Sequence, residues 1–228
     1  MEINKIYNES NLDTMARMPD NFIDLTVTSP PYDNLRTYNG YCFDFENVAK
    51  ELFRVTKQGG VVVWVVSDAT INGSETGTSF KQALYFMQCG FNLHDTMIFR
   101  KKNPIPQIYR KRYNNEFEYM FVFSKGVVKT HNPLMVDCLH AGLELNGTTY
   151  KNYSKNEQTR EKMANPVKAQ KIKGNIWEYV VGTKQEDQEA KGHPAMFPEQ
   201  LANDHILSWS NENDLVYDSF MGSGTTAK

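Results

Sequence analysis

Apolar residues recur along this chain in short runs that alternate between the spacing of a strand and the spacing of a helix. The continuous runs predict strands over 3–7, 22–28, 61–66, 93–100, 117–123 and 214–218. Apolar residues at helical spacing predict helices over 11–18, 45–53 and 80–89, with Gly59-Gly60 ending the second and Gly90 following the third. Strands that alternate with helices in this way predict an α/β fold built on a doubly wound sheet.

The segment 127–173 interrupts this alternation, because it is polar, rich in Asn, Thr, Lys and Gln, and poor in periodic apolar residues. We interpret it as an insertion. The chain then divides into a first part over 1–126, the insertion over 127–173, and a second part of the same domain over 174–228.

A hydroxyl, two prolines and an aromatic ring follow directly after the strand predicted over 22–28, in the stretch Thr28-Ser29-Pro30-Pro31-Tyr32. Ligands of open α/β sheets bind at the carboxyl ends of strands. Ser29 Oγ and the Pro30 carbonyl can accept hydrogen bonds from an NH2 group, and Tyr32 offers a stacking face. The prolines have fixed φ angles that hold these acceptors in place. The alternative is an ordinary polar turn closed by the two prolines.

A glycine-rich turn follows the last predicted strand, in the stretch Ser219-Phe-Met-Gly-Ser-Gly-Thr-Thr226. Such a turn lets the backbone approach a ligand and directs amide groups toward it. A nucleoside triphosphatase loop would require Lys after the second glycine, where this chain has Thr225. The turn therefore suits a carboxylate better than a triphosphate.

The two motifs together, Ser29-Pro-Pro-Tyr32 and Asp218-x-Phe-x-Gly-x-Gly224, resemble the S-adenosylmethionine-dependent amino-methyltransferases of DNA, which modify cytosine N4 or adenine N6. The order, catalytic motif first and glycine loop last, is similar to that of the permuted beta group. The stretch Gly192-His-Pro-Ala-Met-Phe-Pro198 resembles the His-Pro segment of that family. Weaker similarity runs through Gly59-Gly60, 101–104 and 118–126. The resemblance implies a Rossmann-like sheet and a target-recognition role for the insertion.

The resemblance also implies roles for particular residues. Ser29, Pro30, Pro31 and Tyr32 are expected to be catalytic. The expected S-adenosylmethionine site comprises Asp218, Phe220, Gly222, Ser223, Gly224, Thr225 and Thr226 with His193, Pro194 and Ser10. His193 could equally serve as a turn residue, and Ser10 stands where family members often carry Asp. Metal ligands are not expected.

The expected chemistry follows from the delocalised lone pair of an exocyclic amine. Hydrogen bonds from the two amine protons to Ser29 Oγ and the Pro30 carbonyl would favour a pyramidal nitrogen and thereby stabilise the transition state. Transfer would be an in-line displacement that depends on positioning. The base must leave the duplex, and Tyr32 would stack on it. Arg36 and Tyr38 are further candidates for DNA contact.

Charge is distributed unevenly along the chain, although the net charge is only −2. Residues 100–173 carry fifteen Lys and Arg against six Asp and Glu, which leaves a net −11 for the remainder. A cluster of five of these cations is our candidate for phosphate contact: Lys101, Lys102, Arg110, Lys111 and Arg112. This charge distribution favours a nucleic acid partner, with a solvated lysine-rich surface as the alternative, and the resemblance implies that the nucleic acid is double-stranded DNA.

The preferred base is cytosine at N4, with adenine N6 as the alternative. In the family that the chain resembles, Ser at the first catalytic position accompanies mostly cytosine N4, and Asp or Asn mostly adenine N6. An RNA or a protein glutamine amide is a further alternative substrate, because related Pro-Pro-Tyr motifs serve those amides. The resemblance extends the expected partners to a homodimer and a cognate restriction endonuclease.

Lys228 follows the glycine loop closely. The resemblance implies a further helix and a strand with an acidic residue for the cofactor ribose. That strand would lie between the strand over 3–7 and the strand over 214–218, so we expect a gap in the sheet and weak cofactor binding. An inactive DNA-binding relic is thus an alternative function.

Three cysteines without a C-x-x-C pair predict neither a disulfide framework nor a zinc site, which favours a reducing cytoplasm. The N-terminus lacks the apolar core of a signal peptide, and the apolar run over 61–66 is too short to span a bilayer.

Overall fold

The computed structural model describes residues 1–32, 43–106, 111–142, 149–152, 159–162, 167–181, 198–222 and 224–227. Contacts divide the chain into two units: one contains 1–132 and 175–228, and the other contains 133–174. The first unit carries both sequence motifs and the main sheet. No helix in the described part of the chain is long and apolar enough to cross a membrane.

The first unit is built on a six-stranded sheet in the order β11-β5-β6-β2-β1-β12. The bounds of its strands are Ile23–Thr28 for β1, Thr56–Val66 for β2, Asn92–Lys101 for β5, Phe117–Ser124 for β6, Ile176–Tyr179 for β11 and Val216–Tyr217 for β12. β1 is parallel to both β2 and β12, and β11 is parallel to β5. β6 is antiparallel to both of its neighbours. The sheet is therefore mixed, with the predicted catalytic and glycine motifs after adjacent parallel strands.

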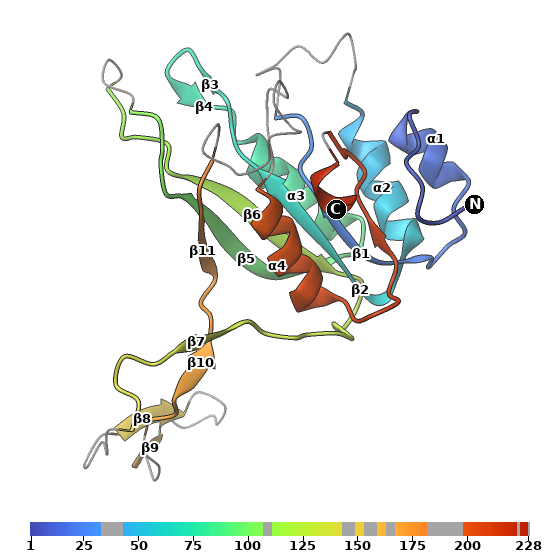
Figure 1. Ribbon diagram of the computed structural model, residues 1–228. Coiled ribbons are helices and arrows are strands. Elements are labelled where there is room, and N and C mark those ends of the chain that lie inside the picture. The colour runs from blue at the N-terminus through green and yellow to red at the C-terminus, as the bar shows by residue number, and fades with distance from the viewer. Residues whose placement is uncertain are drawn as a thin grey trace. The chain divides into compact units, whose positions relative to one another are not determined.

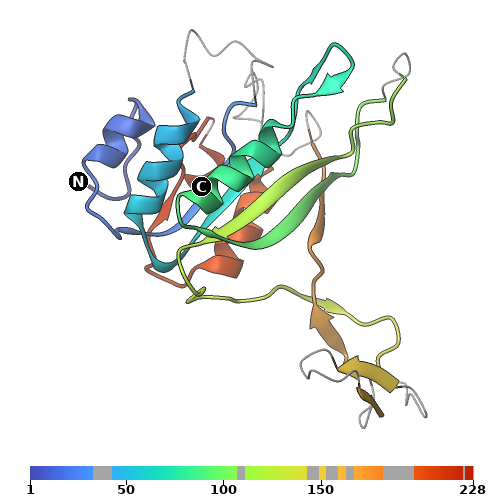
Figure 2. The ribbon, with the colours of Figure 1, turned by 180° about the vertical axis from the view of Figure 1, so that it is seen from behind.

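Helices cover both faces of this sheet, as the two opposite views show (Figure 1, Figure 2). On one face lie α1 (Asn11–Ala16), α2 (Phe45–Val55) and α3 (Thr78–Gln88), and on the other lies α4 (Glu199–Trp209). The predicted doubly wound, Rossmann-like α/β fold is thus confirmed.

Side chains of β6 alternate between the two layers. Phe123 stacks on Phe86 of α3 with ring centroids 4.6 Å apart. Met120 is turned to the other layer, where its sulfur lies 3.3 Å from Nε2 of His205 on α4. Because strand side chains point alternately to opposite faces, this one strand anchors the helices of both layers.

The α1 to α3 layer contains most of the aromatic core. Trp64 of β2 is fully buried and donates its indole N–H to Gln82 Oε1 at 2.9 Å. It also packs edge-on against Phe86. The buried indole thus has both apolar neighbours and a partner for its only donor, as a stable core requires.

Two local predictions are wrong. No strand forms over 3–7, where Ile3 and Ile6 are 58% and 64% exposed. The other error concerns Gly59-Gly60, which lies within β2 and does not end a helix. Helix α2 ends at Val55, and the chain enters β2 at Thr56, whose hydroxyl donates to the Leu52 carbonyl at 2.6 Å.

The register explains this position of the glycines. Ile23 pairs with Thr56 and Leu25 pairs with Val61, so the glycines lie in an irregular part of β2. A Cβ at Gly60 would come within 2.9 Å of the Asp24 carbonyl oxygen. Because no strand forms over 3–7, β12 is the outer strand at this side of the described sheet, and the gap predicted beside it does not arise.

In the first unit, the sequence analysis predicted neither the hairpin of β3 (Thr70–Ile71) and β4 (Ser74–Glu75) nor strand β11 nor helix α4. Helix α4 lacks a simple apolar stripe because polar residues occupy its buried face. Tyr179 of β11 donates its hydroxyl to Asp204 of α4 at 2.7 Å, and the Trp177 ring lies 4.7 Å from the His205 ring. These partners come from distant segments, so local periodicity does not reveal them.

The second unit contains two antiparallel pairs of short strands. β7 (Met135–Asp137) pairs with β10 (Gln170–Ile172), and β8 (Thr149–Asn152) pairs with β9 (Thr159–Lys162). Lys168 and Lys171 are exposed. In the sequence this unit lies between the two segments of the first unit, and its strands are short.

Candidate active site

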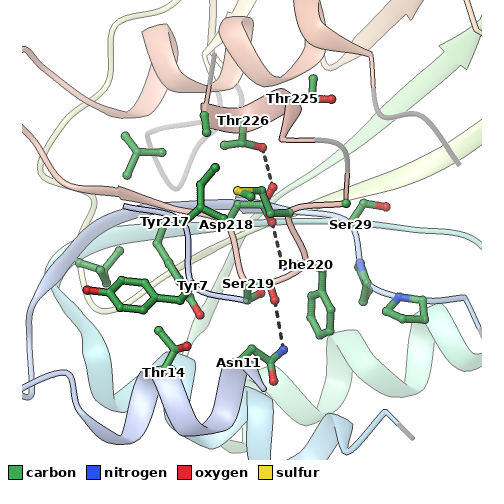
Figure 3. Close-up of a pocket in the computed structure, with 18 of the residues that line it drawn as sticks. Tyr7, Asn11, Thr14, Ser29, Tyr217, Asp218, Ser219, Phe220, Thr225 and Thr226 are labelled. Carbon is green, nitrogen blue, oxygen red and sulfur yellow. Dashed lines mark hydrogen bonds between the residues drawn. The ribbon is translucent and has the colours of Figure 1, made fainter. Parts of the chain in front are cut away.

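A cavity of about 1600 Å³ lies at the carboxyl ends of β1 and β12. The N-terminal segment, the loop after β1 and the glycine loop all line it (Figure 3). β1 and β12 are parallel neighbours, with Thr26 opposite Tyr217, so their carboxyl ends lie at the same edge of the sheet. This edge is the ligand-binding position of open α/β sheets.

Asp218 connects the two loops. Its Oδ1 accepts hydrogen bonds from Thr28 Oγ1 at 2.6 Å and from the Phe220 amide at 2.9 Å. Its Oδ2 accepts one from Thr226 Oγ1 at 2.7 Å. Burial raises the pKa of this carboxyl above its usual range, and the three donors oppose that shift. One partly buried side chain thereby contacts the end of β1 and both ends of the glycine loop.

The glycine loop has the backbone that its composition predicts. Gly222 and Gly224 have φ angles of +53° and +86°, in the left-handed region that favours glycine. The chain then enters a short 3₁₀ turn, η2 (Thr225–Ala227). Phe220 lines the cavity and also packs edge-on against Trp64, with ring centroids 6.1 Å apart. The loop is therefore anchored to the core while it faces the cavity.

The loop after β1 brings the predicted catalytic residues together. Ser29, Pro30, Pro31 and Tyr32 all line the cavity. Ser29 Oγ lies 2.9 Å from the Tyr32 hydroxyl, which donates to Glu118 Oε2 at 2.8 Å. The hydroxyl of Tyr32 thus joins the loop after β1 to strand β6.

Helix α1 supplies a polar side chain at the opposite wall. Asn11 donates through Nδ2 to the Ser219 carbonyl at 3.2 Å, while its buried Oδ1 has no partner among the described residues (Figure 3). A buried acceptor without a donor is costly unless a ligand supplies one. Ser10 precedes it as the N-cap of α1, makes no side-chain capping bond and does not line the cavity.

The other predicted cofactor residues divide into three groups. Phe220, Gly222, Thr225, Thr226 and Asp218 line the cavity. Gly224 belongs to the same loop but does not line it. Ser223, His193 and Pro194 lie outside the described residues, as do the predicted DNA contacts Arg36, Tyr38 and Arg110.

The remaining predicted DNA contacts differ in their surroundings. Lys102 and Lys111 are exposed. Arg112 donates to the Gly73 carbonyl and lies 3.4 Å from Glu75 Oε1. Lys101 forms a 2.8 Å ion pair with Glu118 Oε1, and both of these side chains are less than one fifth exposed. Lys101 is thus part of the cavity wall.

Sequence reasoning missed three residues that shape the cavity. Thr28 belongs to the motif, but its bond to Asp218 became visible only when β1 and β12 were adjacent. Asn11 lies 18 residues before Ser29, and Glu118 lies 86 residues after its partner Tyr32. Separations of this size leave no local pattern that marks either residue. The described residues contain no group of three or more His, Cys, Asp or Glu that could hold a metal ion.

Asp68, at the end of β2, lines the same cavity but is engaged elsewhere. Its Oδ1 accepts from the Ser79 amide at 2.9 Å, in the first turn of α3, and Ser79 Oγ donates to its Oδ2. A carboxylate at this position satisfies free amide groups of the helix start. Asp68 therefore caps the start of α3.

The chain is similar in sequence to DNA methyltransferases. The family model described as DNA methylase, for N6 and N4 methyltransferases, matches residues 23–228. The chain is 56% identical over 210 residues to the orphan methyltransferase M.BamHII of Bacillus amyloliquefaciens, a match covering 90% of this chain and 78% of that protein. It is 25% identical over 234 residues to the type II methyltransferase M.BglII of Bacillus subtilis, covering 99% of this chain and 61% of that protein.

Solved structures share the fold. The PvuII DNA methyltransferase, described as cytosine-N4-specific, matches with a TM-score of 0.69 and 19% identity over 96% of this chain and 75% of that one. A complex of M1.HpyAVI with SAM matches with a TM-score of 0.58 and 20% identity over 98% of this chain and 86% of that one.

Proposed function

Since this chain belongs to the DNA methylase family of N6 and N4 methyltransferases, we propose that it transfers a methyl group from S-adenosylmethionine to cytosine N4 in duplex DNA. The observation that carries the proposal is the hydrogen bond between Thr28 and Asp218. It joins the loop that contains Ser29 to the glycine loop, so an amine acceptor site and a cofactor site open into one cavity.

The residues of the glycine-loop wall suit the cofactor. The backbone of Gly222, with its positive φ, leaves room for close approach, and Thr225 and Thr226 supply hydroxyls beside it. Phe220 offers an apolar face, and Asn11 Oδ1 offers a buried acceptor for a cationic or hydroxyl donor. When bound, S-adenosylmethionine supplies an electrophilic methyl group on sulfur.

The cavity is larger than one ligand requires. Pockets for drug-sized molecules measure about 300–1,000 Å³, whereas this one measures about 1600 Å³. We therefore assign the glycine-loop side to the cofactor and the Ser29 side to a base that has left the duplex. Unstacking the base costs a few kcal/mol, which the cavity walls must offset by contact.

The catalytic loop acts on the amine through its acceptors. Ser29 Oγ and the Pro30 carbonyl accept hydrogen bonds from the two amine protons. These bonds favour a pyramidal nitrogen, whose lone pair is drawn out of conjugation with the ring. Pro30 is buried and Ser29 is partly buried, so water competes weakly for these acceptors. The Tyr32 ring lies in the same wall and can stack on the base. Positioned acceptors of this kind stabilise the transition state more than the ground state.

The choice of cytosine rests on Ser29. In the family that the chain resembles, Ser at this position of the motif accompanies N4 methylation more often than N6 methylation. Adenine presents the same NH2 group to the same acceptors. Contacts with the rest of the base must therefore decide between cytosine and adenine. An adenine product is the alternative outcome of the experiment below.

DNA is the proposed macromolecular partner, and the second unit, with its exposed Lys168 and Lys171, is the proposed target-recognition region. A cognate restriction endonuclease and a homodimer stay predictions. The relative with 56% identity is named an orphan methyltransferase, whereas M.BglII is named a type II methyltransferase. Proteins similar to this chain are thus named both as orphan and as type II methyltransferases.

The base is identified by expressing the protein in cells without other DNA methyltransferases and quantifying methylated nucleosides in their genomic DNA by mass spectrometry. N4-methylcytosine is the expected product. If only N6-methyladenine is found, the family assignment stands and the choice of base is wrong. Sequencing the modified DNA in the same cells gives the recognition site.

A further inference from the structure

The Tyr32 hydroxyl lies between two side chains from distant parts of the chain. It is 2.9 Å from Ser29 Oγ, in the same loop, and 2.8 Å from Glu118 Oε2, on strand β6. All three residues line the large cavity. They form a continuous hydrogen-bonded row that runs from the amine acceptor to a carboxylate.

The carboxylate at the end of this row is held in place from its other side. Lys101 Nζ lies 2.8 Å from Glu118 Oε1, so each carboxylate oxygen has its own partner. Lys101 ends β5, which pairs in antiparallel fashion with β6, where Phe99 is opposite Glu118. The two side chains are 18% and 16% exposed, so solvent screens their interaction less than at the open surface.

Hydrogen-bond chemistry then fixes the direction of the row. An ionised carboxylate can only accept, so the Tyr32 hydroxyl must donate its single proton to Glu118. The Tyr32 oxygen is left as an acceptor, and Ser29 must be the donor in the 2.9 Å contact. Ser29 Oγ then has no proton to direct elsewhere, and its lone pairs face any other partner.

We infer that Glu118 is a positioning residue that, through Tyr32, sets Ser29 Oγ as a hydrogen-bond acceptor for the target amine. The inference rests on the proposed function and adds to it a residue from strand β6. If Ser29 pointed its proton at the base, it would oppose the amine protons. The hydrogen bonds from Ser29 to Tyr32 and from Tyr32 to Glu118 exclude that orientation of the Ser29 proton before the base binds. This is electrostatic preorganisation of the site.

The test is a double-mutant cycle on single-turnover methylation, at the recognition site found by the sequencing described above, with saturating S-adenosylmethionine. Glu118→Gln keeps the shape but offers a neutral acceptor, and charge-assisted hydrogen bonds are roughly twice as strong as neutral ones. We expect Glu118→Gln to slow transfer roughly threefold to tenfold and Tyr32→Phe to slow it at least as much. Because Glu118 acts only through Tyr32, the double variant should be no slower than Tyr32→Phe alone.

A binding measurement supplies a readout that does not depend on turnover. In the absence of cofactor, affinities are compared for duplexes that carry cytosine or 2-pyrimidinone, which lacks the amine, at the target position. The weaker pairing of 2-pyrimidinone with guanine contributes equally for every variant, so the preference for cytosine relative to 2-pyrimidinone should be higher for wild type than for Glu118→Gln or Tyr32→Phe. The matched control is Glu116→Gln, two residues earlier and 46% exposed, which should leave both the rate and the preference unchanged.

The outcomes separate this inference from the proposed function. If wild type transfers no methyl group to DNA, the proposed function fails and takes the inference with it. If wild type is active but the two substitutions multiply in the double variant, or if either leaves the rate and the preference unchanged, the inference alone is overturned. Should Glu118→Gln fail to fold because Lys101 loses its partner, the pair K101Q/E118Q removes both charges together and is tested in the same cycle.

Discussion

Thr28 Oγ1 donates a 2.6 Å hydrogen bond to Asp218 Oδ1 across 190 residues of sequence. Both residues stand at the carboxyl ends of their strands, β1 and β12, which are parallel neighbours. The contact joins the residue before Ser29 to the residue that opens the glycine loop. The contact therefore helps to set the relative placement of the two loops, together with the 3.4 Å contact from Ser219 Oγ to Thr28 Oγ1 and the pairing of β1 with β12.

Replacing Thr28 by Val removes this hydroxyl while keeping the shape and the strand propensity. We expect cofactor affinity to fall roughly tenfold, the effect of losing one hydrogen bond to a partly buried carboxyl, and methylation to slow with it. Isothermal titration calorimetry with S-adenosylmethionine or its demethylated product measures the binding part.

Thr26→Val is a closely matched control for that experiment. Thr26 lies two residues earlier in β1, is fully buried like Thr28, and its hydroxyl has no partner among the described residues. The substitution should leave cofactor binding unchanged and leave stability equal or slightly higher. Equal effects of the two substitutions would show that the contact with Asp218 carries no special weight.

Asp218 should make stability depend on pH in a direction opposite to that of an ordinary salt-bridged carboxylate. Burial raises its pKa in the folded protein above 3.8, so the folded state binds its proton more tightly than the unfolded state. The contribution is fully present below the unfolded pKa and is lost as pH rises through the folded pKa. Relative to Asp218→Asn, wild type should therefore lose unfolding free energy as pH rises from about 4 toward neutrality.

Urea unfolding of both proteins at several pH values measures this difference. Groups common to wild type and Asp218→Asn cancel when one curve is subtracted from the other, which isolates Asp218. A difference that stays flat, or that grows in favour of wild type as pH rises, would mean that the three donors outweigh burial.

The second unit should contact DNA through its cations. Lys168 and Lys171 are exposed there, on either side of the start of β10. Changing both to Gln should weaken DNA binding for all sequences and reduce the slope of log affinity against log salt by about 2, close to one unit for each phosphate contact. Fluorescence anisotropy over a salt series measures the slope. Lys81→Gln, an exposed lysine on α3, is the comparison that should leave it unchanged.

The sequence predicted most of what determines the fold of the first unit. The helix over 45–53 and the strands over 22–28 and 117–123 were predictable because their apolar residues follow one period throughout. Helix α4 was not, since its buried face contains Asp204 and His205, whose partners lie on β11 and β6. A pattern of polar and apolar residues assigns a polar residue to the exposed face. Its burial can be explained only once its hydrogen-bond partner in the fold is known.

The site shows the same division between local and distant information. The loop over 29–32 and the glycine loop were predictable because strands end there and the residue types are specific to their chemistry. Glu118 was not recognised as part of the site, because it lies within an otherwise apolar strand. Its role depends on the β5 to β6 pairing that places Lys101 beside it. Ser10 was expected at the cofactor, yet its neighbours Glu9 and Asn11 line the cavity instead.

Ser29 is proposed to activate an amine of DNA, and a paired measurement on wild type and Ser29→Ala shows whether it does. Purified wild type and Ser29→Ala are incubated with duplex DNA containing the recognition site and S-adenosylmethionine, and methylated nucleosides are quantified by mass spectrometry while DNA affinity is measured alongside. We expect wild type to form methylcytosine and Ser29→Ala to be at least a hundredfold slower, as when a positioned transition-state hydrogen bond is removed. The DNA affinity of the two proteins should be nearly equal. DNA binding by wild type without any methylated base, or undiminished methylation by Ser29→Ala, would contradict this role of Ser29.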